Sequence, residues 1–61
     1  MKAKPKESFC GKLKDGYAYK LVKSNWYPCN LEISIYYITD SNGYKIPFDE
    51  EDFKETFKWK D

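Results

Sequence analysis

Only two cysteines are present, and histidine is absent, so metal and thiol chemistry rests on Cys10 and Cys29 alone. Two thiolates do not complete the four-ligand set of a structural zinc ion, and we expect no metal site. A disulfide between them would close a loop of about 20 residues and contribute roughly 3 kcal/mol. Because a reducing cytosol keeps cysteines in the thiol form, we expect no disulfide but two separate, half-buried thiols.

The densest group of carboxylates is the run Asp49-Glu50-Glu51-Asp52. Glycosidase chemistry needs two carboxyl groups facing each other across a pocket, and a chain of 61 residues leaves no room for such a cleft. The calcium-loop pattern and the Gly-rich phosphate loop are both absent, and no serine has a base as partner. We therefore predict an exposed acidic turn, no cofactor and no enzymatic activity.

Two kinds of binding surface remain. Trp and Tyr are the commonest anchors of protein interfaces, and bases of single-stranded nucleic acid stack on exposed rings while lysines pair with phosphates. The predicted protein-binding surface consists of Trp26, Tyr27, Tyr36, Tyr44, Trp59, Asp49 and Glu50. The alternative, a nucleic-acid surface, consists of Tyr17, Tyr19, Lys20, Lys23 and Lys45. Several of these rings must instead belong to the core.

Charge is divided unevenly along the chain. The net charge is +1, but residues 1–30 carry seven Lys against two acids, whereas residues 31–61 carry four Lys against eight acids. Such asymmetry can mark a partner surface. Arginine is absent, which argues against sequence-specific DNA reading, because Arg supplies the bidentate contact to guanine.

The elements that must position these residues centre on a predicted β-hairpin. Apolar residues alternate with polar ones over 31–39 and again over 44–48, on either side of Asn42-Gly43, which is a strong hairpin signal. We expect one long, coiled strand over 31–39, with Ile33, Ile35 and Ile46 facing a common interior.

The rest of the chain reads as one domain over residues 9–61, preceded by a flexible basic tail over 1–8. Strands are predicted over 9–12 and 17–23, and a loop over 24–30 whose Trp26 and Tyr27 are not wholly buried. A capped helical turn is predicted over 49–55, because Asp49 can accept from the first-turn amides and Phe48 and Phe53 form a hydrophobic staple. A terminal strand follows.

The segments Gly16–Val22, Tyr36–Tyr44 and Pro47–Phe53 resemble the SH3-like small barrels found in bacteriophages and prophages of Gram-positive bacteria. This resemblance implies an all-β fold: a barrel of about five strands with one short helical turn near residues 49–55. It also implies an accessory or host-interacting factor that is not an enzyme. From the residues themselves we expect the aromatic patch beside the acidic turn to bind another protein and to act by occlusion. With no apolar run of membrane-spanning length and no signal-peptide core after the basic start, the expected location is the cytoplasm.

Overall fold

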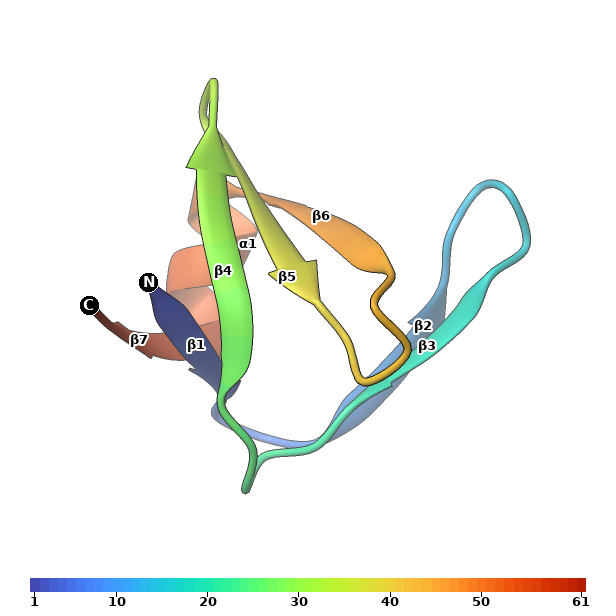
Figure 1. Ribbon diagram of the computed structural model, residues 1–61, viewed down its shortest axis with the longest axis horizontal. Helices are drawn as coiled ribbons and strands as arrows, with labels where there is room; N and C mark the ends of the chain where they lie inside the picture. The colour runs from blue at the N-terminus through green and yellow to red at the C-terminus, as the bar shows by residue number, and fades with distance from the viewer.

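The computed structural model describes residues 1–61 as a mostly β protein with seven antiparallel strands, one short helix and no closed barrel. Five strands form one sheet in the order β6-β5-β4-β1-β7, and two form a separate sheet, β2-β3 (Figure 1). The strands are β1 (Lys2–Pro5), β2 (Phe9–Lys12), β3 (Ala18–Leu21), β4 (Tyr27–Glu32), β5 (Ile35–Thr39), β6 (Lys45–Asp49) and β7 (Phe57–Lys60). The helix is α1 (Glu50–Thr56).

The hairpin around Asn42-Gly43 is confirmed. β5 pairs with β6 in the register Ile38↔Ile46 and Thr39↔Lys45, and Gly43 has a φ of 81°. A positive φ costs glycine little because it has no Cβ, which is why this residue can close the turn.

The long strand predicted over 31–39 is wrong. The chain reverses at Ile33-Ser34, and β4 pairs back with β5 in the register Leu31↔Tyr36 and Glu32↔Ile35. The two turn residues have φ values of 46° and 68°, which is the backbone of a two-residue hairpin loop. Ile33 therefore projects into solvent with 97% of its surface exposed and does not face the interior.

The capped helical turn and the terminal strand are both confirmed. The Asp49 side chain accepts a hydrogen bond of 2.8 Å from the backbone N–H of Asp52. The other residues of the first turn are also acidic, and negative charge there interacts favourably with the positive end of the helix dipole. Phe53 is fully buried. It stacks on Tyr36, with 4.0 Å between ring centroids, and this contact fixes α1 against the five-stranded sheet.

Aromatic rings fill much of the small core. Phe9 of β2 lies edge-on to Tyr19, Phe48 and Phe57, at centroid distances of 6.0–6.2 Å. Ring pairs in this arrangement contribute more than their buried area alone. Phe9 thus joins the two-stranded sheet to the larger sheet through one cluster.

The flexible tail predicted for residues 1–8 is wrong, because residues 2–5 form β1 between β4 and β7. Ala3 and Pro5 are buried, whereas Lys2 and Lys4 point to the other side. A strand can present small apolar residues to the core and lysines to solvent in alternation. The domain therefore includes the N-terminal residues, which the sequence analysis left outside it.

Candidate functional site

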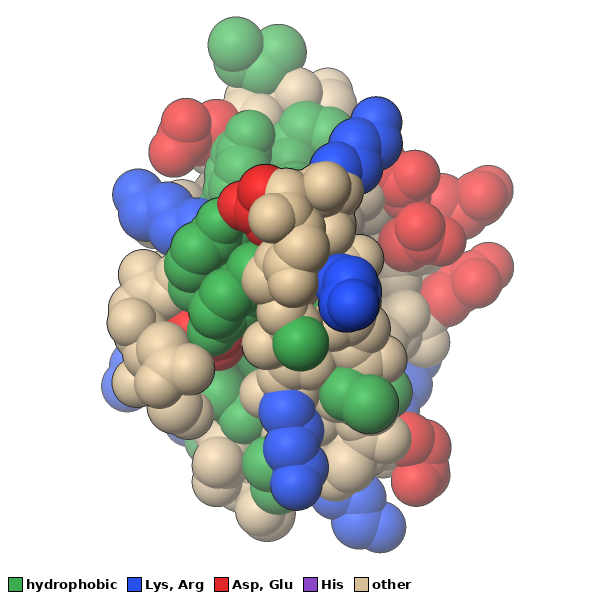
Figure 2. Space-filling model, turned by 90° about the vertical axis from the view of Figure 1, so that its right-hand side faces the viewer, with side chains coloured by type: hydrophobic (Ala, Val, Ile, Leu, Met, Phe, Trp, Pro, Cys, Tyr) green, Lys and Arg blue, Asp and Glu red, His purple; other side chains and the backbone are tan.

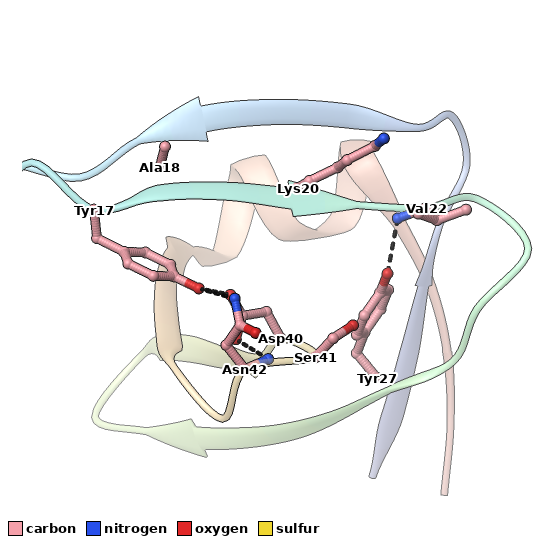
Figure 3. Close-up of a pocket in the computed structure, with 8 residues that line it drawn as sticks. All are labelled: Tyr17, Ala18, Lys20, Val22, Tyr27, Asp40, Ser41 and Asn42. Atoms are coloured by element: carbon pink, nitrogen blue, oxygen red, sulfur yellow. Dashed lines mark hydrogen bonds between the residues drawn. The ribbon is translucent and has the colours of Figure 1, made fainter.

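A small cleft lies between β3 and the turn that joins β5 to β6, with a volume of about 270 Å³ (Figure 3). It is lined by Tyr17, Ala18, Lys20, Val22, Tyr27, Asp40, Ser41 and Asn42. Most of its polar atoms are already paired with one another. The backbone N–H groups of Asn42 and Tyr44 donate to one oxygen of Asp40 at 3.0 and 2.8 Å, and the Tyr17 hydroxyl donates to the other oxygen.

Two turns are joined at this cleft by what we call the tyrosine clasp: Asp15, Tyr17, Asp40 and Tyr44. The rings of Tyr17 and Tyr44 stack with 3.8 Å between centroids and an interplanar angle of 6°. The Tyr17 hydroxyl donates to Asp40, and the Tyr44 hydroxyl donates to Asp15. The clasp connects the β2–β3 loop to the β5–β6 turn and so ties the two sheets together.

These hydrogen bonds shift the proton affinities of the clasp. Donation to Asp40 raises the pKa of Tyr17, and donation to Asp15 raises the pKa of Tyr44. The same bond from Tyr44 lowers the pKa of Asp15, with help from the backbone N–H of Tyr17. The Tyr44 hydroxyl thus keeps its proton while it stabilises the ionised form of Asp15, and this bond holds the two loops together.

The residues predicted for a protein-binding surface do not lie together. Tyr27 is only 4% exposed, and its hydroxyl accepts from the backbone N–H of Val22 at 2.8 Å (Figure 3); the expectation that it stays partly open in a loop is wrong, because β4 begins at this residue. Tyr36 is buried against Phe53. Tyr44 is half-buried within the clasp.

The two tryptophans lie on opposite faces of the sheet. Trp59 is 46% exposed and lies beside Phe53 on the inner face, with 5.3 Å between ring centroids. Trp26 is half-buried on the outer face, near the side chains of Lys4 and Lys60. Asp49 and Glu50 are exposed at the start of α1, so the acidic part of the prediction remains available as a surface.

The residues of the alternative nucleic-acid surface are also dispersed. Tyr17 is engaged in the clasp, and Tyr19 packs edge-on against Phe9 and Phe48. Burial raises the pKa of Tyr19. Lys20 and Lys23 are exposed on and after β3, whereas Lys45 is exposed at the start of β6 in the other sheet.

Sequence reasoning missed the most exposed apolar feature, which we call the hairpin tip: Leu31, Glu32, Ile33 and Ser34. Leu31 is 53% exposed and Ile33 is 97% exposed. Figure 2 shows an apolar side chain projecting above the end of this hairpin, and acidic side chains gathered along the flank on which α1 lies. No local sequence pattern indicates the turn at Ile33-Ser34, because two-residue hairpin loops prefer sequences such as Asn-Gly.

Both cysteines are free thiols, Cys10 exposed and Cys29 buried. Burial raises the pKa of the Cys29 thiol. No group of three or more Cys, Asp or Glu side chains is arranged to hold a metal ion. The single helix, of seven residues, is too short to cross a membrane.

Comparisons with protein-family models, with curated proteins and with solved structures found no match for this chain.

Proposed function

We propose that this protein is a non-catalytic protein-binding factor that docks through its hairpin tip. It would act as a small accessory or inhibitor protein of the phage or prophage type, with an SH3-like arrangement of strands, in the cytoplasm. The observation that carries the proposal is Ile33, a β-branched residue with a positive φ and 97% of its surface in water.

Both properties of Ile33 cost stability. A β-branched residue in the left-handed region is a conformational outlier, and such strained backbone costs on the order of 1–3 kcal/mol. An exposed apolar side chain gains nothing in return until a partner covers it. Strain of this kind gathers at functional loops, so a partner that buries Ile33 and Leu31 explains the choice of residue better than folding does.

The charges around the tip indicate what the partner looks like. Glu32 and Asp49 flank Ile35 in the register of β4, β5 and β6, so the three residues form one row at the same end of the sheet. Glu50 and Glu51 follow at once in α1. An apolar tip beside carboxylates fits an apolar pocket rimmed by lysines or arginines, because complementary charge steers association and fixes its register.

The test replaces Ile33-Ser34 by Asn-Gly, the sequence that this two-residue loop prefers. A photoreactive cross-linker at position 35, next to the tip, would report a partner in nuclease-treated lysate of cells that express the chain. We expect the I33N/S34G variant to fold at least as stably as the native chain and to lose the cross-link. Ser41→Ala, at the exposed end of the other hairpin, is the matched control and should keep it.

Two results would overturn the proposal. One is a cross-linked partner that I33N/S34G retains in full, because the tip would then not be the anchor. The other is a cross-link that appears only when nucleic acid is left intact, because the protein contact would then be indirect.

A further inference from the structure

A cluster of lysines lies on the outer face of the five-stranded sheet, the face turned away from the core. It spans the adjacent strands β7, β1 and β4, near the edge of the sheet where both chain termini lie (Figure 1). We call this cluster, together with its one aromatic ring, the lysine face: Lys2, Lys4, Lys58, Lys60 and Trp26. The register pairs Lys2 with Lys60 and Lys4 with Lys58. Paired residues of adjacent strands point to the same side, and the opposite side is fixed as interior by buried Ala3, Pro5 and Phe57.

These lysines have no anionic partner within the chain. The one ion pair of the structure joins Glu50 to Lys54 at 3.2 Å, on the exposed side of α1. Like charges directly opposite each other in a sheet repel and destabilise the pairing. Two such pairs in neighbouring strands therefore lower stability, and an external anion would relieve the repulsion.

Trp26 lies within this cluster. The Nζ atoms of Lys4 and Lys60 lie 4.9 and 4.3 Å from its ring centroid, and the side chain is half-buried. In the free protein the ammonium groups are thus attracted to the ring face. A cation–π contact at an exposed site is weaker than the stacking of a base on an aromatic side chain. A base can therefore displace the two ammonium groups from the Trp26 ring and stack on it, while the lysines form ion pairs with phosphates.

We infer that the lysine face binds single-stranded nucleic acid, with one base on Trp26 and the neighbouring phosphates on the four lysines. The binding is independent of sequence, because every base can stack on an aromatic ring and the lysines contact only the phosphates. A base must be unstacked to reach the ring, which favours single strands over a duplex. The site lies on the outer face, whereas the tip projects from the end of the β4–β5 hairpin, so the inference does not depend on the proposed protein contact.

The salt dependence follows from the number of lysines. Neutralising four phosphates of a single strand gives a slope of about −3 in a plot of log association constant against log salt concentration. Replacing Lys58 and Lys60 by glutamine should reduce the magnitude of that slope by about 1.4. These substitutions remove like-charge repulsion and so leave the fold intact.

The test measures tryptophan fluorescence in a Trp59→Phe background, so that Trp26 alone reports. The probes are a 12-nucleotide oligothymidylate, a 12-base-pair duplex, and vesicles containing phosphatidylserine. We expect the oligothymidylate to quench Trp26 fluorescence and to bind more tightly than the duplex. The Trp26→Ala variant lacks this signal, so its binding is measured by the fluorescence anisotropy of a labelled oligothymidylate. We expect this variant to bind about tenfold more weakly. K4Q/K60Q should weaken it at least as much, whereas K20Q/K23Q, with two lysines outside the face, should change it less than twofold.

Several outcomes would overturn the inference. Equal binding of duplex and single strand without quenching would indicate a general attraction to polyanions, and binding of vesicles alone would indicate a membrane surface. An equal loss in K4Q/K60Q and K20Q/K23Q would show that charge alone matters. The variant I33N/S34G should bind the oligothymidylate as the native chain does, so failure of the protein contact and failure of this inference can be told apart.

Discussion

Tyr17 and Tyr44 stack face to face, and each donates its hydroxyl to an aspartate of the other's turn. Tyr17 follows Asp15 in the β2–β3 loop and donates to Asp40, whereas Tyr44 follows Asp40 in the β5–β6 turn and donates to Asp15. The exchange is reciprocal. It joins two short loops that lie far apart in the sequence.

Removing the Asp40 side chain should destabilise the protein by about 1–3 kcal/mol, since it leaves three partly buried donors without this acceptor. Asp40 accepts from two backbone N–H groups as well as from Tyr17. We expect Asp40→Ala to cost more than Tyr17→Phe, because the latter removes one hydroxyl only. Urea unfolding followed by circular dichroism measures both.

The control for these substitutions is Tyr37→Phe. The Tyr37 hydroxyl makes no hydrogen bond within the chain, so its removal should leave the free energy of unfolding within about 0.5 kcal/mol of the native value. A double-mutant cycle of Tyr17→Phe and Asp40→Ala isolates their coupling. A coupling of zero would show that the hydrogen bond does not stabilise the clasp.

The clasp predicts losses of stability at both ends of the pH range. The folded pKa of Asp15 is lowered below its ordinary value of 3.8, so its contribution is present above that value and is lost as the pH falls through the folded pKa. The folded pKa values of Tyr17 and Tyr44 are raised above 10.0, so their contribution is complete below pH 10 and is lost as the pH rises beyond it.

Chemical unfolding as a function of pH measures both limbs. Asp15→Asn should flatten part of the acid limb, and tyrosinate absorbance should show that Tyr17, Tyr19 and Tyr44 titrate later in the folded than in the unfolded chain. If Asp15→Asn leaves the acid limb unchanged, the pKa of Asp15 is not lowered in the folded chain and the clasp does not stabilise its ionised form.

Phe53 should be among the most costly side chains to truncate. It is fully buried and stacks on Tyr36 and on Phe57, so it connects α1 to the five-stranded sheet. We expect Phe53→Ala to destabilise the protein by about 3–5 kcal/mol, enough to leave a small domain largely unfolded. Phe53→Leu, which keeps most of the volume, should retain a cooperative thermal transition; equal losses in both variants would contradict this account.

The two thiols should react at different rates. Cys10 is exposed, whereas Cys29 is buried and its pKa is raised by that burial. A thiol-specific reagent should therefore modify one cysteine per native molecule quickly and the second only as the chain unfolds. Cys10→Ser should abolish the fast phase; a fast phase that persists in this variant would show that Cys29 is accessible.

The sequence by itself determined those elements whose signals are local. Asn42-Gly43 favours a tight turn whatever surrounds it, so the β5–β6 hairpin was predictable within one or two residues. Asp49 caps a helix, and Phe48 and Phe53 have the spacing of a hydrophobic staple, so α1 was predictable to the same precision. The mostly β character followed from the period-2 alternation in the same way.

Only the tertiary structure decided which residues face solvent. Ile33 is predicted as a core position because it continues the alternation of its neighbours. The turn at Ile33-Ser34 accompanies the pairing of β4 with β5, and no local sequence preference indicates it. The lysines of β1 and β7 lie more than 50 residues apart in the sequence, and a sheet register brings them together. Contacts across such separations depend on the packing of the whole chain, and a face made of them has no local pattern to predict it.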